Sequence, residues 1–215
     1  MMNQIEVCGH LQGELHFSHK TRNGEKMYVG EIISPRLSGK QDIIPVTVSS
    51  QMLAQVNELA GKTARLRGQL RSYIWRVNGK GQTRMTLYVS EAEESPESTM
   101  NQVDLIGEIS RDPVYRITPF GREICDVMLA VERTHKRKSY IPCVAWGPNA
   151  KLLSLCNVGD RLSITGRIQS REYEKILDSG EKIHRVIQEV SIFRMDAGMD
   201  ADDERMSDLY ASPSL

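Results

Sequence analysis

The stretch Asn3-Gln4-Ile5-Glu6-Val7-Cys8-Gly9 occurs a second time as Asn101-Gln102-Val103-Asp104-Leu105-Ile106-Gly107, 98 residues further along the chain. At the same spacing, Gly68-Gln69-Leu70-Arg71-Ser72 matches Gly166-Arg167-Ile168-Gln169-Ser170. Matches in one register, without an insertion between them, indicate that one module is written twice. A repeat of this length means two domain-sized copies rather than a solenoid of short repeats.

The repeat predicts four segments in the 215 residues. Residues 1–94 form the first copy, residues 95–100 a short polar linker, and residues 101–195 the second copy. Each copy has about 100 residues, which is enough to bury a core of its own. Residues 196–215 hold one Arg and six acidic residues without a periodic apolar pattern. We therefore expect a disordered acidic tail, although the chain as a whole has no net charge.

Apolar and polar residues alternate in most of each copy, as in residues 64–71 and 161–168, and this pattern is typical of strands with one buried face. Residues 51–59 and 148–156 instead show helical spacing, and each stretch ends near a glycine. Each copy then has three strands, one short helix and two further strands. This order predicts an all-β protein with two tandem OB-fold barrels of five strands. In the fourth strand, Gly68 and Gly166 indicate a bend or a close approach of two backbones.

Several functional classes find no support in the sequence. The four cysteines form no C-x-x-C pair and lie away from histidine at zinc spacing, so we expect buried thiols and no metal site. No phosphate loop, nucleophile motif or other catalytic constellation occurs, so neither an enzyme nor a cofactor is expected. Apolar runs are too short to cross a membrane and no signal peptide is visible, which predicts a cytoplasmic protein.

The second copy carries a set of short stretches in a fixed order. They are Leu105-Ile106-Gly107-Glu108-Ile109, Thr118-Pro119-Phe120-Gly121, Val127–Val131, Tyr140–Gly147, Val158-Gly159-Asp160 and Gly166–Tyr173. Through these stretches the second copy resembles the bacterial single-stranded DNA-binding proteins over essentially all of residues 101–195. The first copy resembles them only in its first strand, in Ile44-Pro45-Val46 and in Gly68–Arg71. The resemblance implies binding of single-stranded DNA with little sequence preference in DNA replication, recombination or repair, and a location at the nucleoid.

The resemblance also assigns roles to aromatic residues. The positions of Tyr140, Trp146 and Tyr173 hold rings that stack on bases in the family. Trp75 keeps an aromatic residue at the place in the first copy that corresponds to Tyr173, and Phe120 is a further candidate at a turn. Stacking contributes ~1–3 kcal/mol per base and hardly depends on which base is bound. The alternative is that these rings pack in the core or against a neighbouring strand, as we expect for Phe193.

Basic residues supply the second expected element of the DNA site. The family grips the nucleic-acid backbone with a loop that corresponds here to Arg133, Lys136, Arg137 and Lys138. A solvated turn is the alternative interpretation of this loop. The track of positive charge would be extended by Arg116, Arg167 and Arg171. Each phosphate that such a side chain neutralises steepens the salt dependence of binding.

The first copy departs from the family pattern. Ile43 and Ser49 stand where the second copy has Tyr140 and Trp146. Basic residues remain on and beyond its fourth strand, namely Arg65, Arg67, Arg71 and Arg76. We interpret the first copy either as a weaker binder or as a partly structural module with a residual basic face.

The resemblance also implies partners. Family members commonly assemble four OB folds, so two per chain predict a homodimer, with equivalent contacts made by the first strands. The family's acidic tail docks replication and repair proteins through its last residues. Here the acids are present but the end, Leu209–Leu215, lacks the terminal motif, and the alternative is a tail that only keeps the protein soluble. The alternative function is that of primosomal replication protein N, a related protein-interaction module of replication restart with weak nucleic-acid binding.

Overall fold

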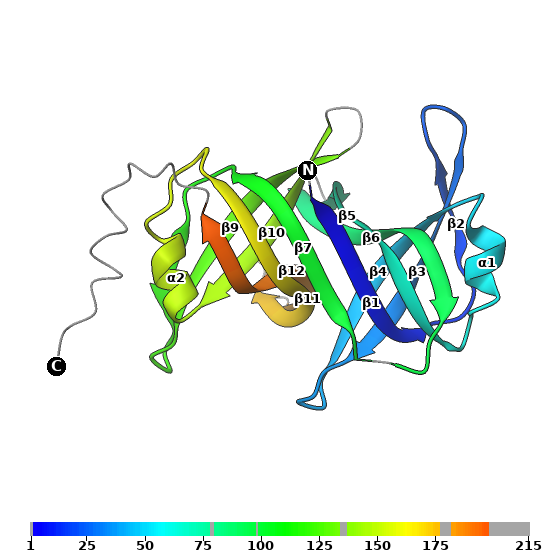
Figure 1. The fold of residues 1–215 in the computed structure, drawn as a ribbon, viewed down its shortest axis with the longest axis horizontal. Helices are drawn as coiled ribbons and strands as arrows, with labels where there is room; N and C mark the ends of the chain where they lie inside the picture. The colour runs from blue at the N-terminus through cyan, green and yellow to red at the C-terminus, as the bar shows by residue number, and fades with distance from the viewer. Residues whose placement is uncertain (1, 78–79, 98, 134–136, 177–181, 198–215) are drawn as a thin grey trace.

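The protein folds into two small β-barrels that lie side by side (Figure 1). The computed structural model describes residues 2–77, 80–97, 99–133, 137–176 and 182–197. The N-terminal half contains β1 (Asn3–Leu11), β2 (His16–Lys20), β3 (Lys26–Pro35), β4 (Gln41–Ser49), α1 (Leu53–Asn57), β5 (Thr63–Val77) and β6 (Lys80–Glu94). The C-terminal half contains β7 (Asn101–Ile109), β8 (Val114–Ile117), β9 (Glu123–Arg133), β10 (Arg137–Trp146), α2 (Pro148–Leu153), β11 (Arg161–Ile176) and β12 (Lys182–Ala197). The predicted all-β class with tandem OB folds is confirmed.

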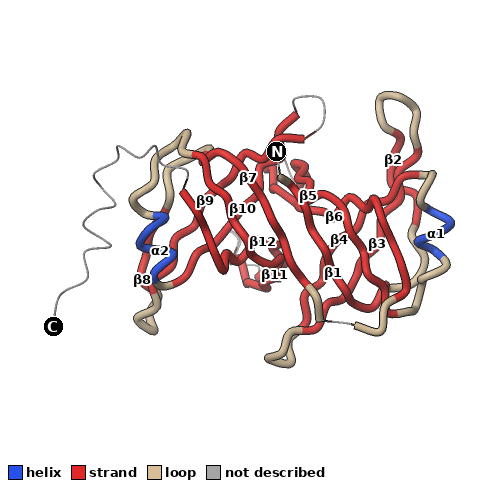
Figure 2. Tube along the Cα trace, in the orientation of Figure 1, coloured by secondary structure: helices blue, strands red, loops and turns tan. Residues whose placement is uncertain are grey.

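The two halves repeat the same order of elements, with small departures from the prediction. In each half a short strand, β2 or β8, is wholly exposed and was not predicted. The helices lie at opposite ends of the molecule (Figure 2) and are shorter than expected, and neither helix in the described residues is long or apolar enough to cross a membrane. Strand β12 includes residues 196 and 197, which we had assigned to the tail. Residues 198–215 of that tail lie outside the described residues.

The strands of each barrel bury apolar side chains, and those of both halves belong to one contiguous core. Residues on alternate positions of the strands are fully buried, such as Leu66 and Leu70 in β5, and all four cysteines are buried and free, as predicted. The strand register shifts at Gly68 in β5 and at Gly166 in β11. A Cβ atom at either glycine would collide with a carbonyl oxygen of the neighbouring strand. The expected close approach of two backbones is therefore present in both halves.

The two halves are joined by antiparallel pairing of β1 with β7. Asn3 lies opposite Leu105, Ile5 opposite Val103, and Val7 opposite Asn101. Ile5 thus pairs with Val103, the residue at the same position of the second copy. The pairing is therefore centred on a pseudo-twofold axis, like the axis of a symmetric dimer. The first strands therefore meet within one chain, and the expectation that they join two chains is wrong. The other edge of each is taken by β5 or β11, so neither is free for a second copy.

Hydrogen bonds of side chains also connect the two halves, at two places that are equivalent in the repeat. At the first, the buried Asp42 carboxylate accepts hydrogen bonds from Arg36 and from the backbone N–H of Ser170. The Ser170 hydroxyl in turn accepts a bond from the Ile43 N–H at 3.2 Å. Since Asp42 and Arg36 come from one half and Ser170 from the other, this cluster fixes the angle between the barrels.

At the second place, serines replace the ion pair. The Ser72 hydroxyl in β5 accepts a hydrogen bond of 2.8 Å from the backbone N–H of Tyr140 in β10. The Ser72 N–H donates to the hydroxyl of the fully buried Ser139 at 3.3 Å. The N-terminal half therefore positions the backbone of Tyr140 directly.

We predict that Asp42→Ala lowers the free energy of unfolding by about 3–5 kcal/mol, because it leaves the partly buried Arg36 without its carboxylate. Urea unfolding followed by circular dichroism measures the change. Lys62→Ala is the matched control, since it breaks an exposed ion pair with Glu94 and should cost at most ~1 kcal/mol. Equal effects of the two substitutions would contradict the role given to Asp42.

Candidate nucleic-acid interface

The predicted stacking residues of β10 point away from the core. Ile141, Cys143 and Ala145 alternate with them and are buried in the barrel. Tyr140 is 49% exposed and Trp146 is 40% exposed. We call the side of β8, β9, β10, β12 and β11 that carries these rings the outer face of the C-terminal half. Burial of the rings, the alternative interpretation, is wrong for both residues.

The strand register continues this outer face onto β12 and β11. Val144 of β10 pairs with Ser191 of β12, and Ser191 pairs with Arg167 of β11. Two residues beyond Ser191, Phe193 is 56% exposed, so its assignment to the core was wrong. The guanidinium carbon of Arg167 lies 6.0 Å from the centre of the Phe193 ring. A cation close to an exposed ring matches what unpaired nucleotides require, a flat surface beside a positive charge.

Other predicted residues are described only in part. Tyr173 pairs with Arg185 in the register of β11 with β12, and Trp75 pairs with Gln82 in that of β5 with β6, but their side chains lie outside the described residues. Lys136 also lies outside them. Phe120 occupies the tip of the turn between β8 and β9 and is 92% exposed.

The predicted basic residues differ in how far they are already neutralised. Arg116 is held by Asp126 through two hydrogen bonds of 2.8 and 3.0 Å, and Lys138 donates to Glu108 at 2.7 Å. The bond to Glu108 raises the pKa of Lys138. Arg133 and Arg137 lie opposite each other at the ends of β9 and β10, and within the described ranges neither has an ion pair. Burial lowers the pKa of Arg133, and the charge of Arg137 lowers it further.

The centre of the outer face contains a carboxylate that the sequence did not reveal. Glu189 is only 8% exposed and accepts a hydrogen bond of 2.8 Å from the Gln169 amide. The Arg171 guanidinium lies 3.7 Å from the same carboxylate. Arg171 is half-exposed, so its position is set by Glu189 while much of its surface still faces solvent. The alternation of β12 could have placed Glu189 on this face, since the apolar Val190 and Ile192 take the buried face of the strand.

In the N-terminal half, part of the expected basic face is neutralised. Arg65 and Arg67 contact glutamates on three sides, Glu6 at 3.4 and 2.9 Å and others from β6 and the linker. They are therefore not free to bind phosphates. Arg71 is different, because it stacks on the Tyr88 ring with 3.3 Å between the guanidinium carbon and the ring centre. Nearby Tyr73 is 45% exposed.

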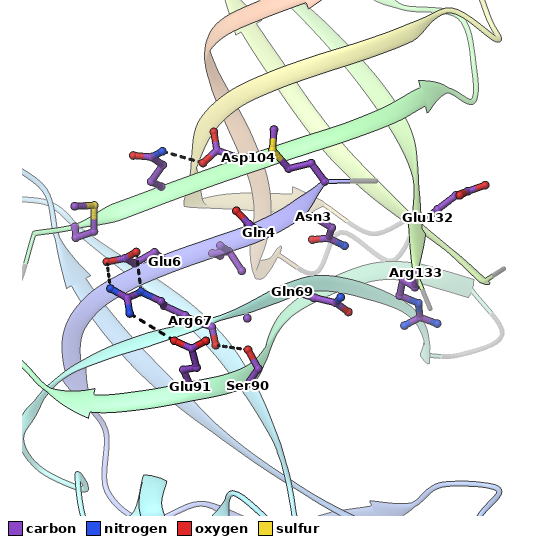
Figure 3. Close-up of a pocket in the computed structure, with 15 residues that line it drawn as sticks. Asn3, Gln4, Glu6, Arg67, Gln69, Ser90, Glu91, Asp104, Glu132 and Arg133 are labelled. Atoms are coloured by element: carbon purple, nitrogen blue, oxygen red, sulfur yellow. Dashed lines mark hydrogen bonds and ion pairs between the residues drawn. The ribbon is translucent and has the colours of Figure 1, made fainter. Parts of the chain in front are cut away.

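A groove of about 810 Å³ runs along β1 and β7 (Figure 3). Both halves line it, and its charged residues are Glu6, Glu91, Asp104 and Glu132 against Arg67 and Arg133. Because acids outnumber bases, the groove does not suit a phosphate backbone. Among the described residues no group of His, Cys, Asp or Glu has the arrangement needed to hold a metal ion.

Comparison with known proteins identifies relatives of the C-terminal half. The model of the "Single-strand binding protein family" matches residues 100–195. Single-stranded DNA-binding protein B of Bacillus subtilis is 38% identical over 81 residues, which are 34% of this chain and 72% of that protein. Single-stranded DNA-binding protein 1 of Lactococcus lactis is 36% identical over 92 residues, or 40% of this chain and 60% of that protein. The family model covers the half that carries Tyr140 and Trp146.

Solved structures extend the likeness to both halves. The crystal structure of the single-stranded DNA-binding protein from Thermus aquaticus superposes with a TM-score of 0.72. The match covers 93% of this chain and 94% of that one at 20% sequence identity. A deletion mutant of the same protein gives a TM-score of 0.66 at 22% identity over 93% of this chain. These TM-scores establish a shared fold that includes both barrels. Sequence identity as low as this shows the fold alone.

Proposed function

We propose that this chain, which belongs to the single-strand binding protein family, binds single-stranded DNA on the outer face of its C-terminal half. Bases stack on Tyr140, Trp146 and Phe193, and phosphates lie against the neighbouring arginines. The role is binding without turnover, and it protects unpaired DNA during replication, recombination and repair. This places the protein at the nucleoid in the cytoplasm.

The observation that carries the proposal is the exposure of two large rings on one strand. Burying an aromatic ring stabilises a fold, so a monomeric barrel gains nothing by leaving Tyr140 and Trp146 in contact with water. Spaced six residues apart in β10, both face outward, and Arg167 and Arg171 lie on β11, with β12 between the two strands. Stacking is tolerant of base identity, since every base has a flat face, which accounts for binding with little sequence preference.

Replacing Trp146 or Tyr140 by alanine should weaken binding of oligo-dT by about 1–3 kcal/mol for each ring, because each substitution removes one stacking surface. Fluorescence anisotropy of labelled oligo-dT measures this at fixed salt. Tyr115→Leu is the matched control, since Tyr115 lies on β8 off the outer face, where its hydroxyl donates to Glu123. Unchanged affinity in both alanine variants would reject the face, and binding of a protein partner alone would favour the primosomal type of function.

Replacing Glu189 by glutamine should raise the affinity for oligo-dT several-fold at low salt, because it removes a negative charge that repels phosphates from the centre of the face. Glutamine has the same shape, so the contact with Gln169 can persist. Glu58→Gln, an exposed change at the end of α1, should leave the affinity as it was. Weaker binding of the Glu189 variant would mean that the carboxylate helps binding by holding Arg171.

We also propose that the chain forms a homodimer that presents four OB folds. The first strands are already paired within each chain, so a second copy needs another surface. The polar groove along β1 and β7 is such a surface, because glutamates and arginines on both sides of the pseudo-symmetry axis can pair with those of another copy. Light scattering should give a mass near twice 24.3 kDa, and a mass of 24.3 kDa would contradict the dimer.

The proposal also gives a role to each segment of the chain. The segments 1–94, 95–100 and 101–195 act as first barrel, linker and second barrel. The acidic residues beyond them dock replication or repair proteins. Deleting residues 198–215 would then abolish capture of such partners while leaving oligo-dT binding intact.

A further inference from the structure

Arg71 in the N-terminal half has a hydrogen-bonding edge that the described protein does not use. Its guanidinium lies on the Tyr88 ring, and one terminal nitrogen donates to the Gln69 side chain at 3.3 Å. The Nε atom is buried and has no hydrogen-bond partner in the part of the chain that the structure describes. Stacking on Tyr88 holds the planar guanidinium in place, and a planar guanidinium held in this way is suited to phosphate recognition.

One arginine of the C-terminal half, Arg133, acts on Arg71 through its charge. Burial lowers the pKa of Arg71, Tyr88 and Glu25 counteract this, and the positive charge of Arg133 adds to the lowering. Arg133 in turn faces Arg137 across the hairpin of β9 and β10. Like charges placed opposite each other destabilise a sheet, so an anion bound beside Arg133 and Arg137 would stabilise this arrangement.

The surroundings of this cluster also combine both halves. An open cleft of about 600 Å³ is lined by the end of β2 and the turn that follows it, and by Arg137. Its charged residues are Lys20, Arg22 and Arg137 against Glu25. On the other side of Arg71, the Ser72 hydroxyl holds the backbone N–H of Tyr140 at 2.8 Å. The cluster thus lies at the junction of the halves, next to the first ring of the outer face.

We infer that a phosphate of single-stranded DNA binds at this junction between Arg71, Arg133 and Arg137, so that one strand continues from the outer face onto the N-terminal half. The inference rests on the proposed function and extends it. The first copy then acts as part of the DNA interface through Arg71, although it lacks rings at Ile43 and Ser49.

The test uses the full chain with Arg71→Gln and an oligo-dT of about 35 nucleotides, longer than the ~4–16 that one OB fold covers. Affinity should fall roughly tenfold, as expected for a lost charged hydrogen bond. The slope of log affinity against log salt should fall by about 0.7, because one phosphate contact is lost. Arg65→Gln is the matched control on the same strand, and it should change neither quantity because glutamates already neutralise Arg65.

Arg137→Gln gives a second test from the other half, on an exposed hairpin residue that is not needed for folding. The double variant should lose less than the two single losses combined, because both arginines bind one phosphate. Unchanged affinity and salt slope in both single variants would overturn the inference, and so would strictly additive losses. If the unchanged protein does not bind the oligonucleotide at all, the proposed function itself fails, which is a separate outcome.

Discussion

The antiparallel pairing of β1 with β7 is the contact on which the rest of the structure depends. An OB barrel with a free first strand exposes a row of unpaired backbone groups, which favours association with another chain. Here the repeat supplies the partner within the same chain, and Ile5 opposite Val103 marks the centre of the pairing. One covalent chain therefore has the architecture of a symmetric dimer, in which the two barrels are free to diverge in sequence.

The divergence is visible where the repeat makes two equivalent contacts. On one side of the junction, Asp42 of the Arg36–Asp42 ion pair accepts a hydrogen bond from the backbone N–H of Ser170. On the other, Ser72 and Ser139 form neutral hydrogen bonds and hold the backbone of Tyr140. The charged contact fixes the two barrels, while the neutral contact lies directly beside an exposed ring. Under the proposed function, the charged contact is structural and the neutral contact adjoins a DNA-binding residue.

The sequence alone predicted the tandem barrels, because the repeat and the alternation of apolar residues are properties of local spacing. It missed β2 and β8, since wholly exposed strands have no buried face to impose a pattern. It placed Tyr140 and Trp146 in the site through family resemblance. The pairing of β1 with β7 could not be predicted, because the two strands are far apart in the sequence. The contact of Arg71 with Tyr88 could not be predicted either, because it depends on how two strands are paired in the folded sheet.

The position of bound DNA is the central claim, and photo-crosslinking maps it directly. An oligo-dT that carries 4-thiothymidine is irradiated with the full chain, and crosslinked peptides are identified by mass spectrometry. The account predicts crosslinks at Tyr140, Trp146 and Phe193. Crosslinks confined to the groove along β1 and β7, or to α1 at the far end of the N-terminal half, would contradict it.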